Sequence, residues 1–132
     1  MVQWSGAFAV GHAMIDAQHR ELFRRHAQLL EAMKRGDKAE IGRLFDFLGS
    51  YVVEHFDEEE QLMKTSGYPA AALHCVAHAA FVREYRSLRA EYEAQGASAA
   101  VCIRVKTWLG DWIAKHIAKA DHGLALFLQQ TA

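Results

Sequence analysis

Cysteine, proline and any excess of one charge are scarce in this chain. Its 132 residues include one proline, Pro69, and two cysteines, Cys75 and Cys102, which form neither a CxxC pair nor a zinc-ribbon spacing. A disulfide scaffold and a zinc ribbon are therefore excluded, and we expect two buried, reduced thiols. The 15 basic and 16 acidic residues give a formal charge of −1. Without a dense Lys/Arg cluster, the sequence indicates no nucleic-acid partner.

Long apolar runs are missing as well. The longest apolar stretches fall well short of the ~18 residues that suggest a membrane helix, so no membrane partner is expected. The first residues, MVQWSGAFAVGHAMID, lack the early positive charge and continuous apolar run of a secretory signal. We therefore expect a cytoplasmic protein. The length predicts a single domain covering residues 1–132, and the balanced charge favours a monomer.

Helical periodicity is the main pattern that the sequence does contain. We find no convincing strand alternation, and apolar residues recur at spacings of three and four. The pattern predicts helices over about 17–35, 38–65, 69–94 and 98–121, after an irregular N-terminal arm (1–15) and before a short helical tail (124–130). Asp16 is the expected N-cap of the first helix, and Pro69 is expected in the first turn of the third. Short connections make neighbours antiparallel, so the predicted fold is all-α, an up-down-up-down four-helix bundle.

The inner face of the second predicted helix is the clearest stripe in the chain. It combines apolar residues with one histidine and one glutamate, and its members are Ile41, Leu44, Phe45, Leu48, Val52, His55, Phe56, Glu59 and Met63. Two polar residues on a core-facing stripe require partners inside the bundle.

Histidine is abundant, with eight residues in the chain. Two i,i+4 pairs, His55 with Glu59 and His74 with His78, each direct two ligands from adjacent helical turns towards one point. In an antiparallel bundle, the start of the first and third helices and the end of the second and fourth lie at the same end. Candidate metal ligands occur at all four of these places, and they are His19, His55, Glu59, His74, His78, His116 and Asp121.

This set of ligands restricts the metal. Five imidazoles and two carboxylates are too many for one tetrahedral zinc, but they suit two first-row metals bridged by the carboxylates, and iron fits such a set well. The zinc-protease motif HEXXH is absent, because the third helix reads HCVAH. His116 and Asp121 are five residues apart, about 140° around a regular helix. Both can reach one site only if the helix ends, loosens or bulges near Asp121, and Gly123 fits a helix that ends there. We therefore predict an irregular last turn.

Each candidate has a simpler structural explanation. A single HxxxE pair is more often a surface contact worth about 0.3 kcal/mol, and only the convergence of seven residues favours metal binding. We expect Glu58 and Glu60 to be solvated, so that Glu59→Ala loses metal and Glu60→Ala does not. His26 lies about 10 Å along the helix from His19, too far for a pair of metals about 3.5–4 Å apart. It is expected to be a buried polar group.

Four blocks of sequence resemble the hemerythrin family. They are IDAQHRELF (15–23), HFDEEEQLM (55–63), YPAAALHCVAHAAF (68–81) and WLGDWIAKHIAKAD (108–121). Together they span most of the chain and contain all seven candidate ligands. Trp4 and Gly11 resemble the single-domain bacterial form of that family, the bacteriohemerythrins.

The resemblance implies a non-haem di-iron centre that binds O2 reversibly. The cofactors would be two Fe ions joined by an oxo or hydroxo bridge, with O2 as the ligand. One iron would be held by His74, His78 and His116. The other would be held by His19 and His55 and would have an open position. Glu59 and Asp121 would bridge the two irons.

The implied function is O2 carriage, storage or delivery to an oxygen-consuming enzyme, and not an enzymatic activity. Two alternatives use the same ligands and stay open: a di-iron enzyme that acts as a peroxidase or scavenges NO or O2, and an O2 or redox sensor. The sensor is less expected because no residues remain for a signalling domain.

Overall fold

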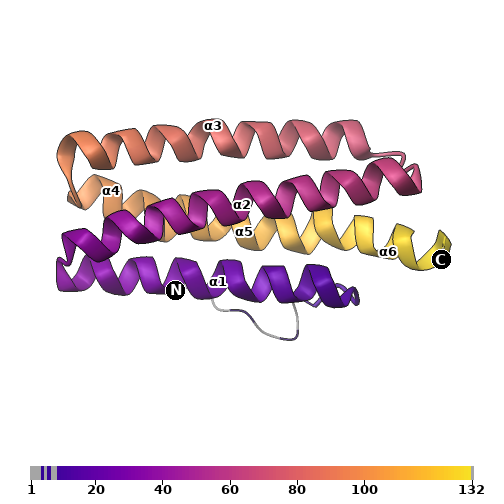
Figure 1. Ribbon diagram of the computed structural model, residues 1–132, viewed down its shortest axis with the longest axis horizontal. Coiled ribbons are helices and arrows are strands. Elements are labelled where there is room, and N and C mark those ends of the chain that lie inside the picture. The colour runs from indigo at the N-terminus through magenta and orange to yellow at the C-terminus, as the bar shows by residue number, and fades with distance from the viewer. Residues whose placement is uncertain (1–3, 5, 7–8, 132) are drawn as a thin grey trace.

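The computed structural model describes residues 4, 6 and 9–131, which fold as an antiparallel four-helix bundle (Figure 1). The first three helices are α1 (Ala13–Arg35), α2 (Lys38–Ser66) and α3 (Ala71–Gln95). The fourth is built from five consecutive segments: α4 (Ala99–Ile103), η2 (Arg104–Leu109), α5 (Gly110–His116), η3 (Ile117–Asp121) and α6 (His122–Thr131). The backbone stays right-handed at each junction, so they form one long helix. The predicted fold class is confirmed.

Local capping residues explain where most helices begin and end. The side chains of Asp37 and Ser98 each accept the backbone N–H three residues on, at 3.1 and 3.2 Å, as N-caps do. Gly36 (φ 68°) and Gly67 (φ 71°) end α1 and α2 in a left-handed conformation that costs glycine little. Pro69 lies in the following turn, two residues before α3 begins. Its predicted place in the first helical turn was wrong.

The start of α1 also differs from the prediction. The helix begins at Ala13, and His12 is the N-cap, with its Nδ1 accepting a first-turn N–H at 3.3 Å. Asp16 is buried, and its carboxylate accepts the N–H groups of Val10 at 2.7 Å and Gly11 at 3.3 Å. The predicted N-cap was wrong because the helix begins three residues before Asp16, whose carboxylate instead binds two N–H groups just before the helix.

The fourth helix was predicted to end at about residue 121, but it continues to Thr131. The predicted irregularity near Asp121 is confirmed as a bulge, because η3 (Ile117–Asp121) is a π-helical segment. A π segment has i→i+5 hydrogen bonds and widens a turn by one residue without breaking the helix. An earlier π segment, η2, contains Val105, whose carbonyl accepts a hydrogen bond from His26 Nε2 at 2.7 Å. His26 is thus a buried structural histidine, as expected.

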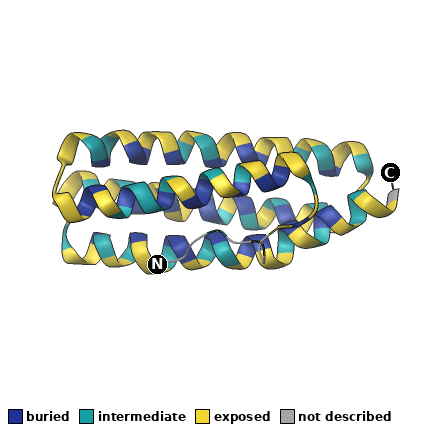
Figure 2. Ribbon diagram, turned by 90° about the horizontal axis from the view of Figure 1, so that it is seen from below, coloured by how far each residue is buried: buried dark blue, intermediate teal, exposed yellow. Residues whose placement is uncertain are grey.

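The apolar core lies on both sides of the level that holds the candidate ligands. All nine residues predicted for the inner face of α2 are buried, and Figure 2 shows buried segments facing the bundle interior. The main apolar cluster includes Leu29, Phe45 and Leu88. A smaller one joins Val10, Ile15 and Ala125. The candidate ligands are therefore enclosed by apolar side chains along the bundle axis.

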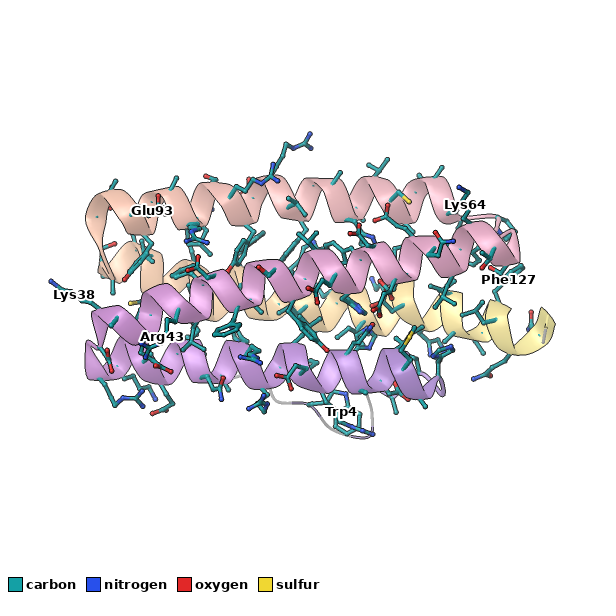
Figure 3. All side chains as sticks on the ribbon, viewed as in Figure 1. Trp4, Lys38, Arg43, Lys64, Glu93 and Phe127 are labelled. Atoms are coloured by element: carbon teal, nitrogen blue, oxygen red, sulfur yellow. The ribbon has the colours of Figure 1, made fainter. Side chains whose placement is uncertain are left out.

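The side-chain view separates the two ends of the bundle (Figure 3). Lys64 and Phe127 mark the end where α2 finishes and α6 extends, and Lys38 and Glu93 mark the opposite end. Cys75 and Cys102 are half-buried free thiols, so the prediction that both are buried was wrong. None of the helices in the described part of the chain combines the length and apolar character needed to cross a membrane.

Candidate metal centre

The seven candidate ligands lie together inside the bundle, and each is at most 9% exposed. They form two overlapping groups, in each of which one ligand atom per residue lies within 4.8 Å of all the others. The three-histidine group consists of His74, His78, His116, Glu59 and Asp121. The two-histidine group consists of His19, His55, Glu59 and Asp121. Two metal-sized sites therefore share one pair of carboxylates.

Helix geometry places these residues at one level of the bundle. On α2, His55 and Glu59 are one turn apart, and His74 and His78 repeat that spacing on α3. Asp121 is the last residue of the π segment η3, which begins directly after His116. Because i→i+5 bonding brings residues five apart onto one face, η3 lets both side chains face the same point. This is the physical reason for the irregular turn that the sequence predicted.

Nitrogen–nitrogen distances in the three-histidine group have the size that a shared cation requires. The Nε2 atoms of His74 and His78 each lie 3.1 Å from Nε2 of His116. With metal–nitrogen bonds of about 2.1 Å, neighbouring ligands are about 3.0 Å apart at 90° and about 3.4 Å apart at the tetrahedral angle. The observed separation is therefore compatible with three imidazoles that share one cation.

The two carboxylates lie between the histidine groups. Asp121 Oδ2 is 2.7 Å from His19 Nε2, and its Oδ1 is 3.0 Å from His74 Nε2. Glu59 Oε1 is 3.3 Å from His78 Nε2 and 3.5 Å from His55 Nε2. Each carboxylate therefore approaches imidazoles of both groups, which is the position of a bridging ligand.

The electrostatics of these carboxylates favour a nearby positive charge. Burial, followed by the negative charge of Asp121, raises the pKa of the Glu59 carboxyl well above its usual range. Burial also acts to raise the pKa of Asp121, but hydrogen bonds from His116 and His19 outweigh it and hold that pKa well below its usual range. Both oxygens of Glu59 are buried without a hydrogen-bond partner among the described residues. An unpaired buried carboxylate is costly, and a cation would offset that cost.

Two of the histidines, His55 and His78, are kept in the neutral form that binds metals. Burial, with the nearby His116 and His74, lowers the pKa of His78 from 6.5 to about 2. Burial also lowers the pKa of His55, although Asp121 opposes the shift. A neutral imidazole keeps a nitrogen lone pair available for a metal. Nitrogen and carboxylate donors in these numbers fit first-row transition metals.

Aromatic rings form one wall of the centre and leave a small cavity beside it. The ring of Phe56 is stacked on His78 at 3.7 Å, and that of Trp112 on His116 at 4.4 Å. A cavity of ≈ 10 Å³ borders His55, His116 and Asp121, and its remaining lining residues are Leu22, Val52, Phe56, Phe81, Trp112, Ile113 and Ile117. Such a volume holds about one water-sized molecule. A far larger groove of ≈ 470 Å³, between α2 and α3, borders none of the candidate ligands, and a pocket of ≈ 370 Å³ borders one of them, His78.

Outer contacts of the ligands include three residues that the sequence analysis did not predict. The His55 ring contacts Gln18, which in turn contacts Glu58, and the His78 ring contacts Glu60. Glu58 is exposed, as expected, but Glu60 is half-buried beside His78, so the expectation that Glu60 is solvated was wrong. No spacing within one helix could have indicated Gln18 or Glu60 as a neighbour of these rings, because each contact joins two helices.

Comparison with known proteins places the chain in a family. Residues 10–127 match the model of the Hemerythrin HHE cation binding domain. A bacteriohemerythrin of Methylococcus capsulatus is 31% identical over 122 residues, covering 92% of each chain. The myohemerythrin of Sipunculus nudus is 25% identical over 118 residues, covering 89% of this chain and 86% of that protein.

A solved structure agrees with this match. The crystal structure of a wild-type hemerythrin superposes with a TM-score of 0.85 at 29% identity, covering 97% of this chain and 98% of the other. The family model covers nearly all of the described bundle, including every member of the two overlapping groups. The chain therefore belongs to the hemerythrin family.

Proposed function

We propose that this protein binds O2 reversibly at a non-haem di-iron centre. The observation that carries the proposal is the pair of overlapping ligand groups, which share Glu59 and Asp121 and are buried in the bundle. Family membership supports iron as the metal, and the donor set of imidazoles and carboxylates suits it.

Each of the two ligand groups would hold one of the two irons. One iron would be held by the three histidines His74, His78 and His116, and the other by His19 and His55, with both carboxylates shared. The second iron would have one protein ligand fewer, so a position would remain for O2. When bound, the iron pair supplies the electrons that O2 takes up on binding and returns on release.

The surrounding side chains favour a carrier over an enzyme. The cavity beside His55 and His116 has room for one very small molecule and is lined mainly by apolar groups. An organic substrate needs a far larger pocket at the reacting centre, and the pocket of ≈ 370 Å³ borders His78 of the three-histidine group but no member of the two-histidine group. Apolar walls also keep water and protons away from bound O2, which favours its release unchanged. Phe56 and Trp112 hold two of the ligand rings in place by stacking.

Stopped-flow mixing of the reduced, iron-loaded protein with O2 distinguishes the carrier from the di-iron enzyme. A carrier develops a visible band with O2 and loses it on deoxygenation, over repeated cycles and without net O2 consumption. Continuous O2 consumption in the presence of a reductant, without a band that reverses, would contradict the proposal and favour the scavenging enzyme.

A further inference from the structure

Two candidate ligands have a second ring nitrogen that contacts a polar side chain outside the two ligand groups. His55 Nδ1 lies 2.5 Å from Gln18 Oε1, and His78 Nδ1 lies 3.1 Å from Glu60 Oε2. One of these rings belongs to the two-histidine group and the other to the three-histidine group. Each group therefore contains one histidine whose Nδ1 contacts a polar side chain outside the two ligand groups.

The polarity of the first contact is set at the surface. Glu58 is exposed, and its carboxylate accepts a hydrogen bond from Gln18 Nε2. An ionised carboxylate only accepts hydrogen bonds, so the amide NH2 of Gln18 must face Glu58 and its oxygen must face His55. His55 Nδ1 must then carry the proton. Its Nε2, which is buried without a hydrogen-bond partner, keeps a free lone pair directed towards the carboxylates.

The polarity of the second contact follows from Glu60 alone. Its carboxylate accepts a hydrogen bond from His78 Nδ1 at 3.1 Å. The Nδ1 of His78 therefore carries the proton. Its Nε2 is unprotonated, with the lone pair directed towards His116 and Glu59. The stacked ring of Phe56 fixes the plane in which this contact is made.

We propose that Gln18, Glu58 and Glu60 are positioning residues that fix His55 and His78 as Nδ1–H tautomers before any metal binds. The proposal rests on the proposed function only in taking Nε2 of both rings to face the metals. Glu58 acts through Gln18, and Glu60 acts directly. None of the three contacts a metal itself.

The two contacts differ in charge, which makes the centre asymmetric. A carboxylate that accepts from a ligand imidazole raises the basicity of the ring, and a neutral amide does so less. His78 is therefore the stronger donor, and it belongs to the group with three histidines. His55, in the group with two, has the neutral partner. Loss of an outer partner of this kind weakens metal binding about 10–100-fold.

Ring tautomers in the metal-free protein test the proposal without iron or O2. Long-range ¹H–¹⁵N correlation spectra at pH 8 distinguish protonated from unprotonated ring nitrogens. We expect Nδ1–H for both rings in the wild type, a mixture of tautomers for His78 in Glu60→Ala, and a mixture for His55 in Glu58→Ala. Glu60→Gln is expected to restore the Nδ1–H form, because its amide oxygen still accepts. Asp57→Asn, which removes an exposed acid of the same helix, is the control and should leave both rings unchanged.

Metal affinity supplies the second readout, with Co²⁺ as the probe. Glu60→Gln keeps the hydrogen bond but removes the charge, so it should bind Co²⁺ about tenfold more weakly than Asp57→Asn. Nε2–H on His78 in the wild type, or identical tautomers in the wild type and Glu60→Ala, would overturn the proposal even if O2 binds reversibly. Conversely, the expected tautomers in a protein that fails to bind O2 would contradict the proposed function alone. If Glu60→Ala does not fold, equal Co²⁺ affinity of Glu60→Gln and Asp57→Asn overturns the proposal.

Discussion

Replacing Glu59 by leucine should have opposite effects on the metal-free and metal-loaded protein. In the metal-free protein, the Glu59 side chain is fully buried, and neither of its oxygens has a hydrogen-bond partner among the described residues. A buried polar group without a partner costs about 1–3 kcal/mol. Glu59→Leu removes this cost, so the free energy of unfolding of the metal-free protein should rise by about that amount.

The same substitution removes a ligand that both histidine groups share. With Fe²⁺ at about 100 times its Kd, the wild type should gain about 2.7 kcal/mol of stability from binding, and the variant should gain little of it. Thermal unfolding followed by circular dichroism, with and without Fe²⁺ under anaerobic conditions, measures both effects. For a domain of this length, each kcal/mol corresponds to roughly 3–6 °C in Tm.

Asp121→Leu is the matched comparison. Asp121 accepts a hydrogen bond from His19 Nε2 at 2.7 Å, so its loss leaves a buried donor unpaired. The metal-free variant should be destabilised by about 1–3 kcal/mol, while metal binding is lost as in Glu59→Leu. If Glu59→Leu destabilised the metal-free protein as much as Asp121→Leu, or if it kept the stabilisation by Fe²⁺, the reasoning about a missing cation would be refuted.

Three further predictions follow from single residues. Burial lowers the pKa of His26 below 6.5, so the stability that its neutral form contributes is complete above pH 6.5 and is lost as the pH falls. In the metal-free protein below pH 6.5, His26→Gln should reduce the slope of the unfolding free energy against pH by up to about 1.4 kcal/mol per pH unit. An unchanged slope would refute the assignment of this pH dependence to His26. Val52→Ala enlarges the cavity of ≈ 10 Å³ and admits water, so the O2-dependent visible band should decay faster at an unchanged iron content, as stopped-flow spectroscopy would show. Gly123→Ala should raise Tm by an amount corresponding to about 0.5–1 kcal/mol, because alanine favours a helix more than glycine does. The cost of shifting the Tyr68 hydroxyl, which lies 3.2 Å from the new Cβ, reduces this gain. A lowered Tm would argue against a helical Gly123.

Positions whose role depends on one helix could be predicted well from the sequence. The inner face of α2 was predicted residue by residue, because a period of 3.6 and burial together determine which side chains face the core. The common level of the seven candidate ligands followed from alternating helix directions. The irregular turn before Asp121 followed from the angle that separates it from His116 on a regular helix.

Positions whose role depends on a neighbouring segment could not be predicted in this way. Asp16 looked like an N-cap, but it binds the N–H groups of an arm whose path is not encoded locally. Gly123 looked like a helix end, but a π segment solves the same angular problem without ending the helix. Glu60 looked like a surface acid, and its contact with His78 becomes evident only when α2 and α3 are placed side by side.

The number of O2 molecules bound per iron tests the central claim most directly. Protein reduced without air and loaded with Fe²⁺ would be analysed for iron per chain, titrated with O2, and then deoxygenated. The account predicts about two irons per chain, one O2 taken up for each pair, and its recovery with loss of the visible band. One iron per chain, or O2 that is consumed and cannot be recovered, would contradict it.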